Sequence, residues 1–402
     1  MDKVKVVWLC HLTNDELDRH FGIEKDMCAF WMTQFINIVK GQPIELHVVT
    51  PNYYTNENVN IQIGHVFYHL YKYYSGIGNA KTAFVELAIR NERPVVNAVG
   101  KIVNNIKPDI VHLFGAENIT YSKGILPLMD KYPTIVSFQG YIQLAELKGS
   151  FFRQYTMKCR VKTENEILRK CPNISFGEFE GQSRQYYIEK YNTGKVHTIN
   201  FPFKVPAIDA SKVEKEYDIV FWGRVTVDKG VEDLINAVEI VKRNNKEIKC
   251  LILGGGSSEY RQKLDRMVTE KDLEGNIIFG GFQKTNEELF GNAAKAKIYV
   301  LPTHYDALPG SIREGMYMKL PVISYPVGDI PQLNKNKDCV LLAEYLDIKD
   351  LASKIEILLH DDDLRNKLIA NSYSEVATTN DTSYIANQFM ETYRSLIKQD
   401  MQ

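Results

Sequence analysis

Four charged side chains lie in loops that follow strand-like runs in the second half of the chain. Asp306 and Glu314 come after the apolar run 298–301, and Arg224 and Lys229 come after the run 218–222. A carboxylate can bind two hydroxyls of a ribose or hexose at once, whereas arginine and lysine can bind a diphosphate. Loops after parallel strands are where open α/β sheets bind ligands. These residue types therefore predict a site for sugar hydroxyls and phosphate.

The loop with the two cations has a glycine at each end. Gly223 follows the strand-like run directly, and Gly230 precedes a helix-like segment. Glycine lets the backbone approach a ligand closely, and a helix N-terminus favours anions. In a partly desolvated site each cation–phosphate contact would contribute about 4 kcal/mol. The alternative is an ordinary surface turn whose cations are solvated.

Each acid also has a structural alternative. Ser311 and Glu314 fit a capping box, in which the glutamate would bond the backbone N–H of Ser311 as the N-cap residue. Asp306 could be an ordinary turn residue, since aspartate is common in turns. The residues alone leave both alternatives open.

Composition excludes some classes of function. The chain has 402 residues, 44% hydrophobic and 25% charged, which predicts two domains. With 49 basic and 50 acidic residues the net charge is −1, which argues against nucleic-acid binding. The apolar run at the N-terminus is too short for a membrane-spanning helix, and no small-residue cleavage site follows it. We therefore expect a cytoplasmic protein. The six scattered cysteines predict reduced buried thiols, and Asp361–Asp363 predicts a helix start rather than a metal site.

Strand-like and helix-like segments alternate along the whole chain. This alternation predicts parallel sheets covered by helices on both faces. A proline-containing stretch near Asn200 is the best linker candidate. We therefore expect an N-terminal domain at 1–203, a second at 204–382 and a final helix at 383–402. Ile385, Phe389, Tyr393 and Leu396 share one face of that helix, which we expect to pack back on the first domain.

From about Tyr217 to Asn371 the chain resembles the glycosyltransferases of family 4. The family has Glu, seven residues and Glu, followed by a helix of small residues and Pro-Val-Ile; here Asp306 replaces the first Glu. It also has Gly-Arg, four residues and Lys-Gly after the first strand of the second domain, as at 223–230. The resemblance implies the GT-B fold, in which two Rossmann-like α/β domains face each other across a cleft.

The same resemblance implies roles for individual residues. Arg224 and Lys229 would stabilise the donor diphosphate, and Asp306 would lie close to the donor sugar as the third catalytic residue. Glu314 would bind the ribose hydroxyls. Other donor-binding positions would be Gly223, Phe282, Leu308, Pro309, Gly310 and Ser311. Phe282 as a core residue and Phe282 as a neighbour of the base remain equal alternatives, and Gly254–Gly256 is either a donor-side turn or a tight connection.

The first domain resembles the family only weakly. The stretch 108–115 is similar to a Pro-Asp-Val-Val-His strand, and its His112 is either a structural histidine or an acceptor-side residue. Glu117 lies just beyond and could face the cleft. Gln139 stands where many members have histidine; it can bond a sugar hydroxyl but cannot carry a proton at neutral pH.

The resemblance implies a retaining glycosyltransferase that moves a sugar from a nucleoside diphosphate, with UDP favoured, to a hydroxyl of a glycan or lipid-linked acceptor. A role in bacterial surface polysaccharide synthesis fits the family. We expect no metal and no cofactor. The alternatives are a sugar-nucleotide epimerase of similar fold and a non-catalytic nucleotide-sugar-binding protein. The basic, aromatic segment 150–170 is either a solvated helix face or a contact with anionic lipid at the inner face of the cell membrane.

Overall fold

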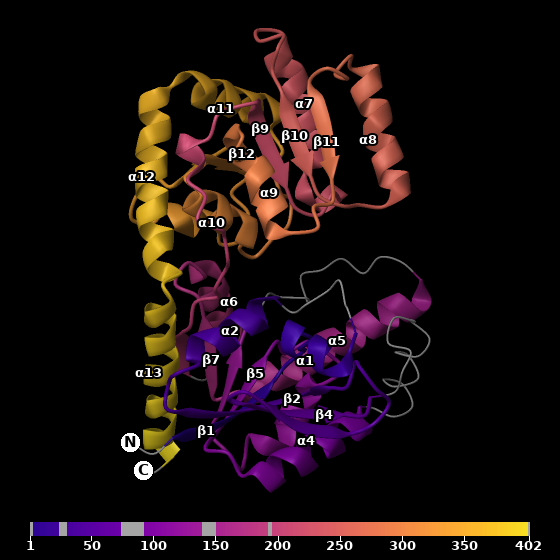
Figure 1. Cartoon of the computed structure of the whole chain (residues 1–402), viewed down its shortest axis with the longest axis vertical. Coiled ribbons are helices and arrows are strands. Elements are labelled where there is room, and N and C mark those ends of the chain that lie inside the picture. Colours follow the sequence, from indigo (N-terminus) through magenta and orange to yellow (C-terminus); the bar gives the residue numbers. More distant parts are fainter. Residues whose placement is uncertain (1–2, 24–29, 74–91, 139–149, 192–194, 401–402) are drawn as a thin grey trace. The chain divides into compact units, whose positions relative to one another are not determined.

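The computed structural model describes residues 3–23, 30–73, 92–138, 150–191 and 195–400. They form two compact units (Figure 1). Unit 1 comprises the described parts of 1–178, 184–202 and 382–402, and unit 2 comprises 179–183 and 203–381. We predicted divisions at 203/204 and 382/383. The segment 179–183 lies inside the predicted first domain but belongs to unit 2.

Unit 1 is built on an eight-stranded sheet of order β3-β4-β2-β1-β5-β6-β7-β8. All neighbouring strands are parallel except β3 and β4, which form an antiparallel hairpin at one edge. Strands β1, β2 and β5 are almost fully buried and rich in valine, isoleucine and leucine, as expected for a sheet covered on both faces. The strands are β1 Val4–Leu9, β2 Ile44–Pro51, β3 Val59–Ile63, β4 Val66–Tyr71, β5 Ile110–Phe114, β6 Thr134–Ser137, β7 Asn173–Phe176 and β8 Lys195–Thr198.

Helices connect most of these strands. In the part of the chain that the structure describes they are α1 Asp15–Phe21, α2 Phe30–Val39, α4 Arg93–Ile106, α5 Phe151–Lys170, α6 Gly181–Tyr191 and α13 Thr382–Asp400, with the 3₁₀ helix η2 Ser122–Leu128.

Unit 2 is built on a six-stranded parallel sheet of order β11-β10-β9-β12-β13-β14. Relative to the chain this is the order 3-2-1-4-5-6 of the dinucleotide-binding fold. The predicted α/β class with two Rossmann-like domains is therefore confirmed. The strands are β9 Tyr217–Trp222, β10 Cys250–Leu253, β11 Ile277–Gly281, β12 Ala296–Leu301, β13 Val322–Ser324 and β14 Val340–Leu342. The helices are α7 Val231–Lys242, α8 Ser258–Glu270, α9 Asn286–Ala293, α10 Gly310–Tyr317, α11 Ile348–His360 and α12 Asp362–Thr379, with 3₁₀ turns η4 Ala210–Lys212, η5 Val227–Lys229 and η6 Ile330–Asn334.

A buried carboxylate holds the short segment 179–183 to unit 2. Asp329 is fully buried and accepts hydrogen bonds from the backbone N–H of Gln182 at 2.6 Å and from the backbone and hydroxyl of Ser183. These groups lie in the first turn of α6. The first N–H groups of a helix lack intrahelical partners, and the helix dipole favours an anion there. Asp329 therefore fixes the start of α6, whose later turns belong to unit 1.

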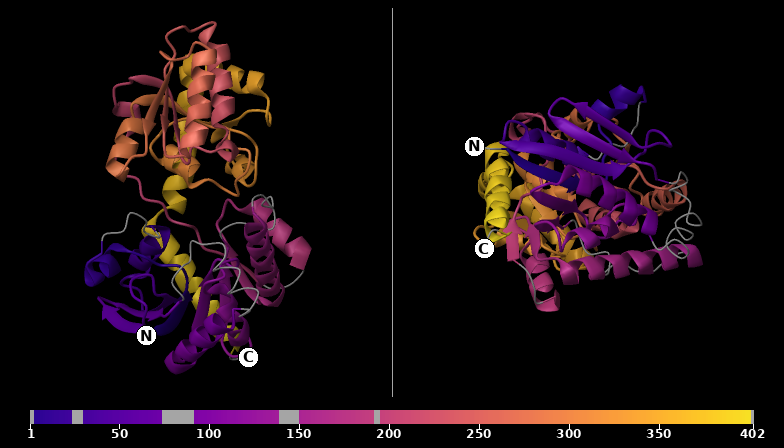
Figure 2. Two further views of the ribbon diagram at one scale, coloured as in Figure 1. Left: turned by 90° about the vertical axis from the view of Figure 1, so that its right-hand side faces the viewer. Right: turned by 90° about the horizontal axis from the view of Figure 1, so that it is seen from below.

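The last helix, α13, packs into unit 1 as predicted (Figure 2). Ile385, Phe389, Tyr393 and Leu396 are all buried in one core cluster with Trp8. Trp8 Nε1 donates to the Tyr393 hydroxyl at 2.9 Å, and that hydroxyl lies 2.8 Å from His112 Nδ1. Burial lowers the pKa of His112 well below its usual value, because the charged imidazole loses its hydration. The neutral ring can therefore accept a hydrogen bond from the Tyr393 hydroxyl at Nδ1, while its Nε2–H donates to the Ser137 hydroxyl at 2.7 Å.

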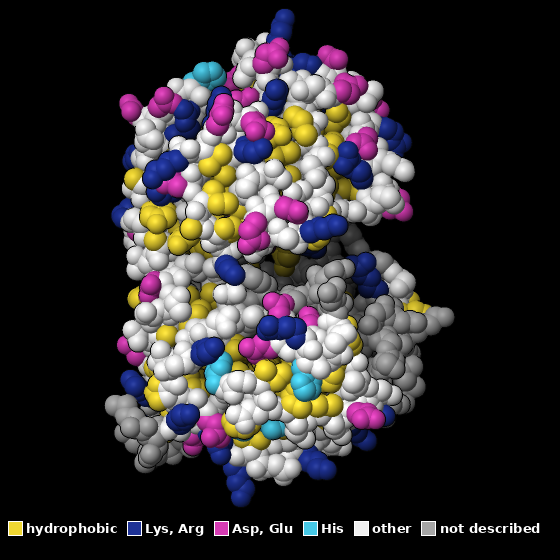
Figure 3. Space-filling view, viewed as in Figure 1, with side chains coloured by type: hydrophobic (Ala, Val, Ile, Leu, Met, Phe, Trp, Pro, Cys, Tyr) yellow, Lys and Arg dark blue, Asp and Glu magenta, His cyan; other side chains and the backbone are white. Residues whose placement is uncertain are grey.

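Acidic and basic side chains alternate over the face drawn in Figure 3, in keeping with the near-zero net charge. Among the described residues, no helix is long and apolar enough to cross a membrane.

Removing the Tyr393 hydroxyl should destabilise unit 1. In Tyr393→Phe the buried Trp8 N–H loses its acceptor and His112 its donor, which should cost about 1–3 kcal/mol in the free energy of unfolding. Tyr373→Phe, on α12 with a side chain 36% exposed, is the control and should change it by less than about 0.5 kcal/mol. Denaturant unfolding measures both, and equal effects would contradict the buried network.

Candidate functional site

Four of the predicted site residues lie at the point where the strand order of unit 2 reverses. Strand β9 is paired on one side with β10 and on the other with β12. The loops that leave the carboxyl ends of β9 and β12 carry Arg224, Lys229 and Asp306, and Glu314 follows on α10. In open α/β sheets ligands bind outside the carboxyl ends of the strands at this switch point. The topology thus brings together two sequence motifs that are about 80 residues apart.

The two loops are in direct contact because one residue is glycine. Gly230 has a φ of +70°, and a Cβ added to it would lie 1.8 Å from the carbonyl oxygen of Pro302. We predicted that this glycine would admit a ligand; its observed role is to admit the neighbouring loop. The Asp228 carbonyl accepts hydrogen bonds from His304 N at 2.8 Å and from Thr303 Oγ1 at 3.0 Å.

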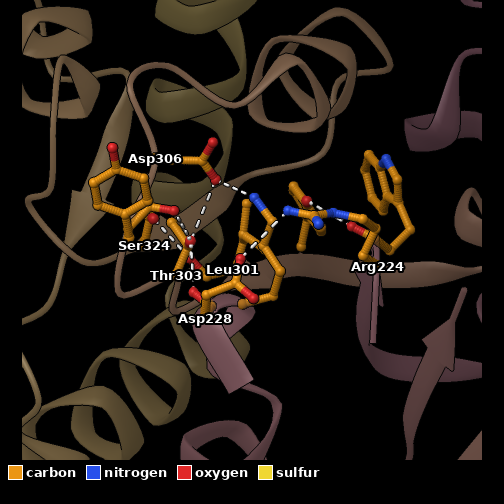
Figure 4. Close-up of polar contacts among 10 residues, drawn as sticks. Arg224, Asp228, Leu301, Thr303, Asp306 and Ser324 are labelled. Carbon is orange, nitrogen blue, oxygen red and sulfur yellow. Dashed lines mark hydrogen bonds and ion pairs between the residues drawn. The ribbon is translucent and has the colours of Figure 1, made fainter. Parts of the chain in front are cut away.

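The contact between the loops brings two predicted catalytic residues together as an ion pair. Lys229 Nζ pairs with Asp306 Oδ2, and Thr303 Oγ1 lies 3.2 Å from the same oxygen. Both side chains of the pair are largely buried, whereas Arg224 is 71% exposed and lies 3.4 Å from Asp228. Figure 4 draws Asp228 between Arg224 and the neighbouring Thr303 and Asp306. One cation is therefore fixed and the other is held loosely at the surface.

Glu314 does not cap its own helix, so the capping-box alternative is wrong. Helix α10 begins at Gly310 with Pro309 as the N-cap, and no side chain caps it. Ser311 already lies inside the first turn, so Glu314 has no N-cap amide in the predicted place. Its Oε2 instead accepts a hydrogen bond from Trp222 Nε1 at 3.1 Å. Burial raises the pKa of Glu314, while the Trp222 bond and the charge of Arg313 oppose that rise.

Trp222 is a positioning residue that the sequence did not reveal. Its ring stacks on Tyr299 with centroids 3.6 Å apart, and the Tyr299 hydroxyl donates to the Trp222 carbonyl at 3.2 Å. Gly315 makes room for both rings, since a Cβ there would lie 2.9 Å from Tyr299 and 3.2 Å from Trp222. In the sequence Trp222 looks like a strand residue among apolar neighbours. Only the sheet order shows that its N–H meets a carboxylate on α10.

The backbone of the Asp306 loop is supported from β13. Gly328 has a φ of +53°, and a Cβ there would lie 2.1 Å from the Asp306 carbonyl oxygen and 2.3 Å from that of Ala307. Asp329 N donates to the Ala307 carbonyl at 2.6 Å. The following predicted donor-binding positions run into the first turn of α10: Leu308, Pro309, Gly310 and Ser311. Their place at a helix N-terminus suits contact with an anion.

The glycine-rich turn after β10 packs against Gly223. A Cβ on Gly254, whose φ is +138°, would lie 1.8 Å from the Gly223 carbonyl oxygen, so the tight connection is observed. Phe282 follows β11 at the same edge and is 74% exposed, which excludes the core alternative for this side chain. An exposed aromatic ring at the carboxyl edge of the sheet is available for stacking on a base.

The residues predicted for the acceptor side of unit 1 have different outcomes. His112 as a site residue is wrong, because it is fully buried with both ring nitrogens bonded inside the core. Glu117 follows β5, beside β1, at the switch point of the first sheet, and its Oε1 lies 4.0 Å from Arg160. Burial raises its pKa. Gln139 lies outside the described residues.

Among the described residues there is no group of three or more His, Cys, Asp or Glu side chains that could hold a metal ion. Asp361 is the N-cap of α12 and bonds Leu364 N at 2.8 Å, so the predicted helix start is confirmed.

Residues 207–375 match the family model of the glycosyl transferases group 1. An alpha-D-kanosaminyltransferase from Streptomyces kanamyceticus is 24% identical over 320 residues, which are 77% of this chain and 81% of that protein.

Two solved structures share the fold at low sequence identity. The sucrose-phosphate synthase from Thermosynechococcus elongatus has a TM-score of 0.73 at 17% identity and covers 99% of this chain and 100% of its own. The Anabaena protein HepE in complex with UDP and glucose has a TM-score of 0.65 at 15% identity and covers 98% and 100%.

The two Rossmann-like sheets, the switch-point residues and these similarities agree with one another. The chain is a glycosyltransferase of the GT-B fold, and residues 207–375 of its second unit match the glycosyl transferases group 1.

Proposed function

We propose that the chain transfers a sugar from a UDP-sugar to a hydroxyl of a glycan or lipid-linked acceptor, with retention at the anomeric carbon and without a metal. The observation that carries the proposal is the switch point of unit 2, where Lys229 and Arg224 stand beside the acids Asp306 and Glu314. UDP is chosen because HepE, which shares the fold, is solved with UDP and glucose. The resemblance to family 4 adds a bacterial surface polysaccharide as the product, and the N-terminal sequence favours the cytoplasm as the place of the reaction.

In the proposed reaction the bond between the sugar C1 and the diphosphate oxygen breaks and a bond from C1 to the acceptor oxygen forms. The acceptor hydroxyl proton passes to the departing diphosphate on the same face of the sugar. Lys229 and Arg224 offset the charge that develops on that diphosphate, which is the largest electrostatic change in the reaction. Glu314 accepts the ribose hydroxyls. Glu117 is proposed for the acceptor side, together with Gln139.

Asp306 needs a role that differs from that of the longer glutamate in the family. Aspartate is one methylene shorter, and here its carboxylate already has Lys229 and Thr303 as partners. We propose that it orients Lys229 in the free enzyme. When the diphosphate binds, Lys229 exchanges one anion for another, and the freed carboxylate can accept a hydroxyl of the sugar.

Lys229→Ala should lower turnover at least ~100-fold, the magnitude usual for one lost electrostatic stabiliser. It also leaves the Asp306 carboxylate unpaired beside the phosphate position, so UDP should bind more weakly. In the double variant Lys229→Ala/Asp306→Asn this repulsion is absent, and UDP should bind about tenfold more tightly than in the single variant, a difference of about 1.4 kcal/mol. Calorimetry with UDP measures the Kd of the wild type, the single variant and the double variant.

Lys271→Ala is the matched control, because Lys271 forms an ion pair of 2.6 Å with Glu239 elsewhere in unit 2 and should leave UDP binding unchanged. Equal binding by Lys229→Ala and the wild type would remove the phosphate assignment. The wild-type rate is also measured in excess EDTA, where no change is expected; loss of activity would refute the metal-free part of the proposal.

Glu314→Gln should weaken UDP binding and remove part of its pH dependence. A lost charged hydrogen bond costs about 1.5–3 kcal/mol, or roughly tenfold to a hundredfold in Kd. Because burial raises the pKa of Glu314, the wild type should lose affinity as the pH falls through a range above that of an ordinary glutamate. The phosphate of UDP titrates too, so the difference between wild type and variant is the informative quantity. Parallel pH profiles would contradict the role of Glu314.

The same variant should stabilise the free protein at neutral pH. A carboxyl group whose folded pKa is raised holds its proton more tightly in the folded state, so stability is lost as the pH rises through that pKa. Glutamine keeps the acceptor for Trp222 without the buried charge. Thermal unfolding is measured without ligand. The Tm of Glu314→Gln minus the Tm of the wild type should be larger at pH 7 than at pH 4.

We also propose that α5 contacts an anionic membrane surface. Phe151, Lys158, Lys162 and Arg169 are exposed and spaced by seven, four and seven residues, which places them on one line along the helix. Phe151 is 70% exposed. A cavity of about 610 Å³ beside this line is lined by Lys162, Asn165, Glu166, Arg169, Lys170 and Lys190. Each basic residue near an anionic surface contributes about 1 kcal/mol.

Sedimentation with vesicles tests this contact. Vesicles of phosphatidylglycerol should retain the protein at low salt, whereas phosphatidylcholine vesicles should not. Lys158→Glu/Lys162→Glu should abolish retention, and Lys101→Glu/Lys131→Glu, at exposed positions on other elements of unit 1, should preserve it. Equal retention of both double variants would favour the solvated-face alternative.

A further inference from the structure

A second acid in unit 2 accepts two hydrogen bonds from two different loops. Asp233 lies in the first turn of α7, and its side chain is only 13% exposed. Its Oδ2 accepts from His304 Nε2 at 2.8 Å and from the Tyr325 hydroxyl at 3.0 Å. His304 belongs to the loop after β12 and Tyr325 to the loop after β13. One carboxylate therefore ties both loops to the helix that follows Lys229.

His304 is held on several sides. Its ring stacks on Tyr325 with centroids 6.2 Å apart and meets the edge of Tyr345 at 6.5 Å. The backbone N–H of His304 donates to the Asp228 carbonyl, and the His304 carbonyl accepts a hydrogen bond from the Tyr345 hydroxyl at 3.4 Å. Since the backbone and the ring are both fixed, the residues that follow have little freedom. Asp306 is two residues away.

The two fixed points lie on either side of the Lys229–Asp306 pair along the chain. The Asp228 carbonyl fastens the loops beside Lys229, and Asp233 fastens the loop beside Asp306. If His304 lost its bond to Asp233, its side chain would no longer anchor the loop, which would then depend on backbone bonds such as those from His304 to Asp228 and from Asp329 to Ala307. Asp306 would then have more positions available, and so would the ammonium group that pairs with it. Even a small displacement of Lys229 would matter, since a misplacement of about 1 Å can lower the rate of an enzyme a hundredfold.

The pair also has an electrostatic consequence. Asp233 lies near the N-terminus of α7, which favours anions and which the donor diphosphate would approach. A carboxylate at that place without a strong hydrogen-bond donor would repel the diphosphate. The N–H of His304 offsets that charge by bonding Asp233.

We propose that Asp233 and His304 are a positioning pair that fixes the Asp306 loop and thereby directs Lys229 to the second phosphate of the donor. This inference rests on the proposed function. It predicts that the pair affects recognition of the second phosphate and leaves recognition of the nucleoside and the first phosphate unchanged. The ratio of the Kd for UMP to the Kd for UDP isolates the second phosphate.

The experiment compares His304→Ala, His304→Gln and the wild type by calorimetry with UMP and UDP. His304→Ala should lower the preference for UDP over UMP about tenfold with UMP binding unchanged. His304→Gln should restore the preference to within threefold, because the glutamine amide N–H can take the place of Nε2–H. His360→Ala, at an exposed histidine at the end of α11, is the matched control and should retain the wild-type preference.

The outcomes separate this inference from the function on which it rests. A wild type without a preference for UDP, or a Lys229→Ala variant that keeps it, would refute the diphosphate assignment itself. If Lys229→Ala loses the preference and His304→Ala keeps it, only the positioning role is refuted. If His304→Ala weakens UMP and UDP equally and His304→Gln rescues neither, the pair serves the stability of the fold alone.

Discussion

The ion pair between Lys229 and Asp306 joins the diphosphate-binding part of the proposed donor site to its sugar-binding part. Its partners come from loops that are far apart in sequence, and each is largely withdrawn from water. A single buried charge would be costly, so the two loops have to be held where the charges can meet. Much of the structure at the carboxyl edge of unit 2 serves this requirement. Gly230 admits Pro302, the Asp228 carbonyl binds the neighbouring loop, and Gly328 admits the backbone of Asp306.

The pair also explains why the free enzyme can keep a cation ready for phosphate. A lone lysine would be solvated and mobile, and each binding event would have to order it. With Asp306 beside it, Lys229 is already ordered and its charge is balanced. Glu314 is kept in place in a similar way, because the indole N–H of Trp222 occupies one of its oxygens. In both cases a neutral or oppositely charged neighbour holds a functional side chain in place.

The sequence predicted some features much better than others. The predicted strand-like runs 218–222 and 298–301 lie within two residues of β9 and β12, because these apolar runs are bounded by glycine, proline or charged residues, whereas the three-residue strand β14 was not predicted. The short strands β7 and β8 and the hairpin β3–β4 were missed, since their mixed polar and apolar residues give no clear period. The burial of α13 followed from its regular apolar face. Its contact with His112 did not, because that contact joins residues 281 positions apart.

Within the site, the charged residues could be predicted but their partners could not. Motif spacing identified Lys229 and Asp306 without showing that they pair. The N-cap of α10 is Pro309, two residues before the predicted Ser311, because Pro309, with its fixed φ, precedes the helix without a side-chain cap. Trp222, Asp233 and His304 carry no motif. Their roles depend on which strands are neighbours, and that order is a property of the folded sheet.

The segment 179–183 gives unit 2 a discontinuous sequence. Asp329 is fully buried, and its hydrogen-bond donors are supplied by Gln182 and Ser183, which precede Asp329 by more than 140 positions. A fragment beginning at residue 203 would keep the carboxylate and lose those donors. An uninterrupted fragment that keeps them has to begin at or before residue 179 and therefore carries 184–202 of unit 1 with it.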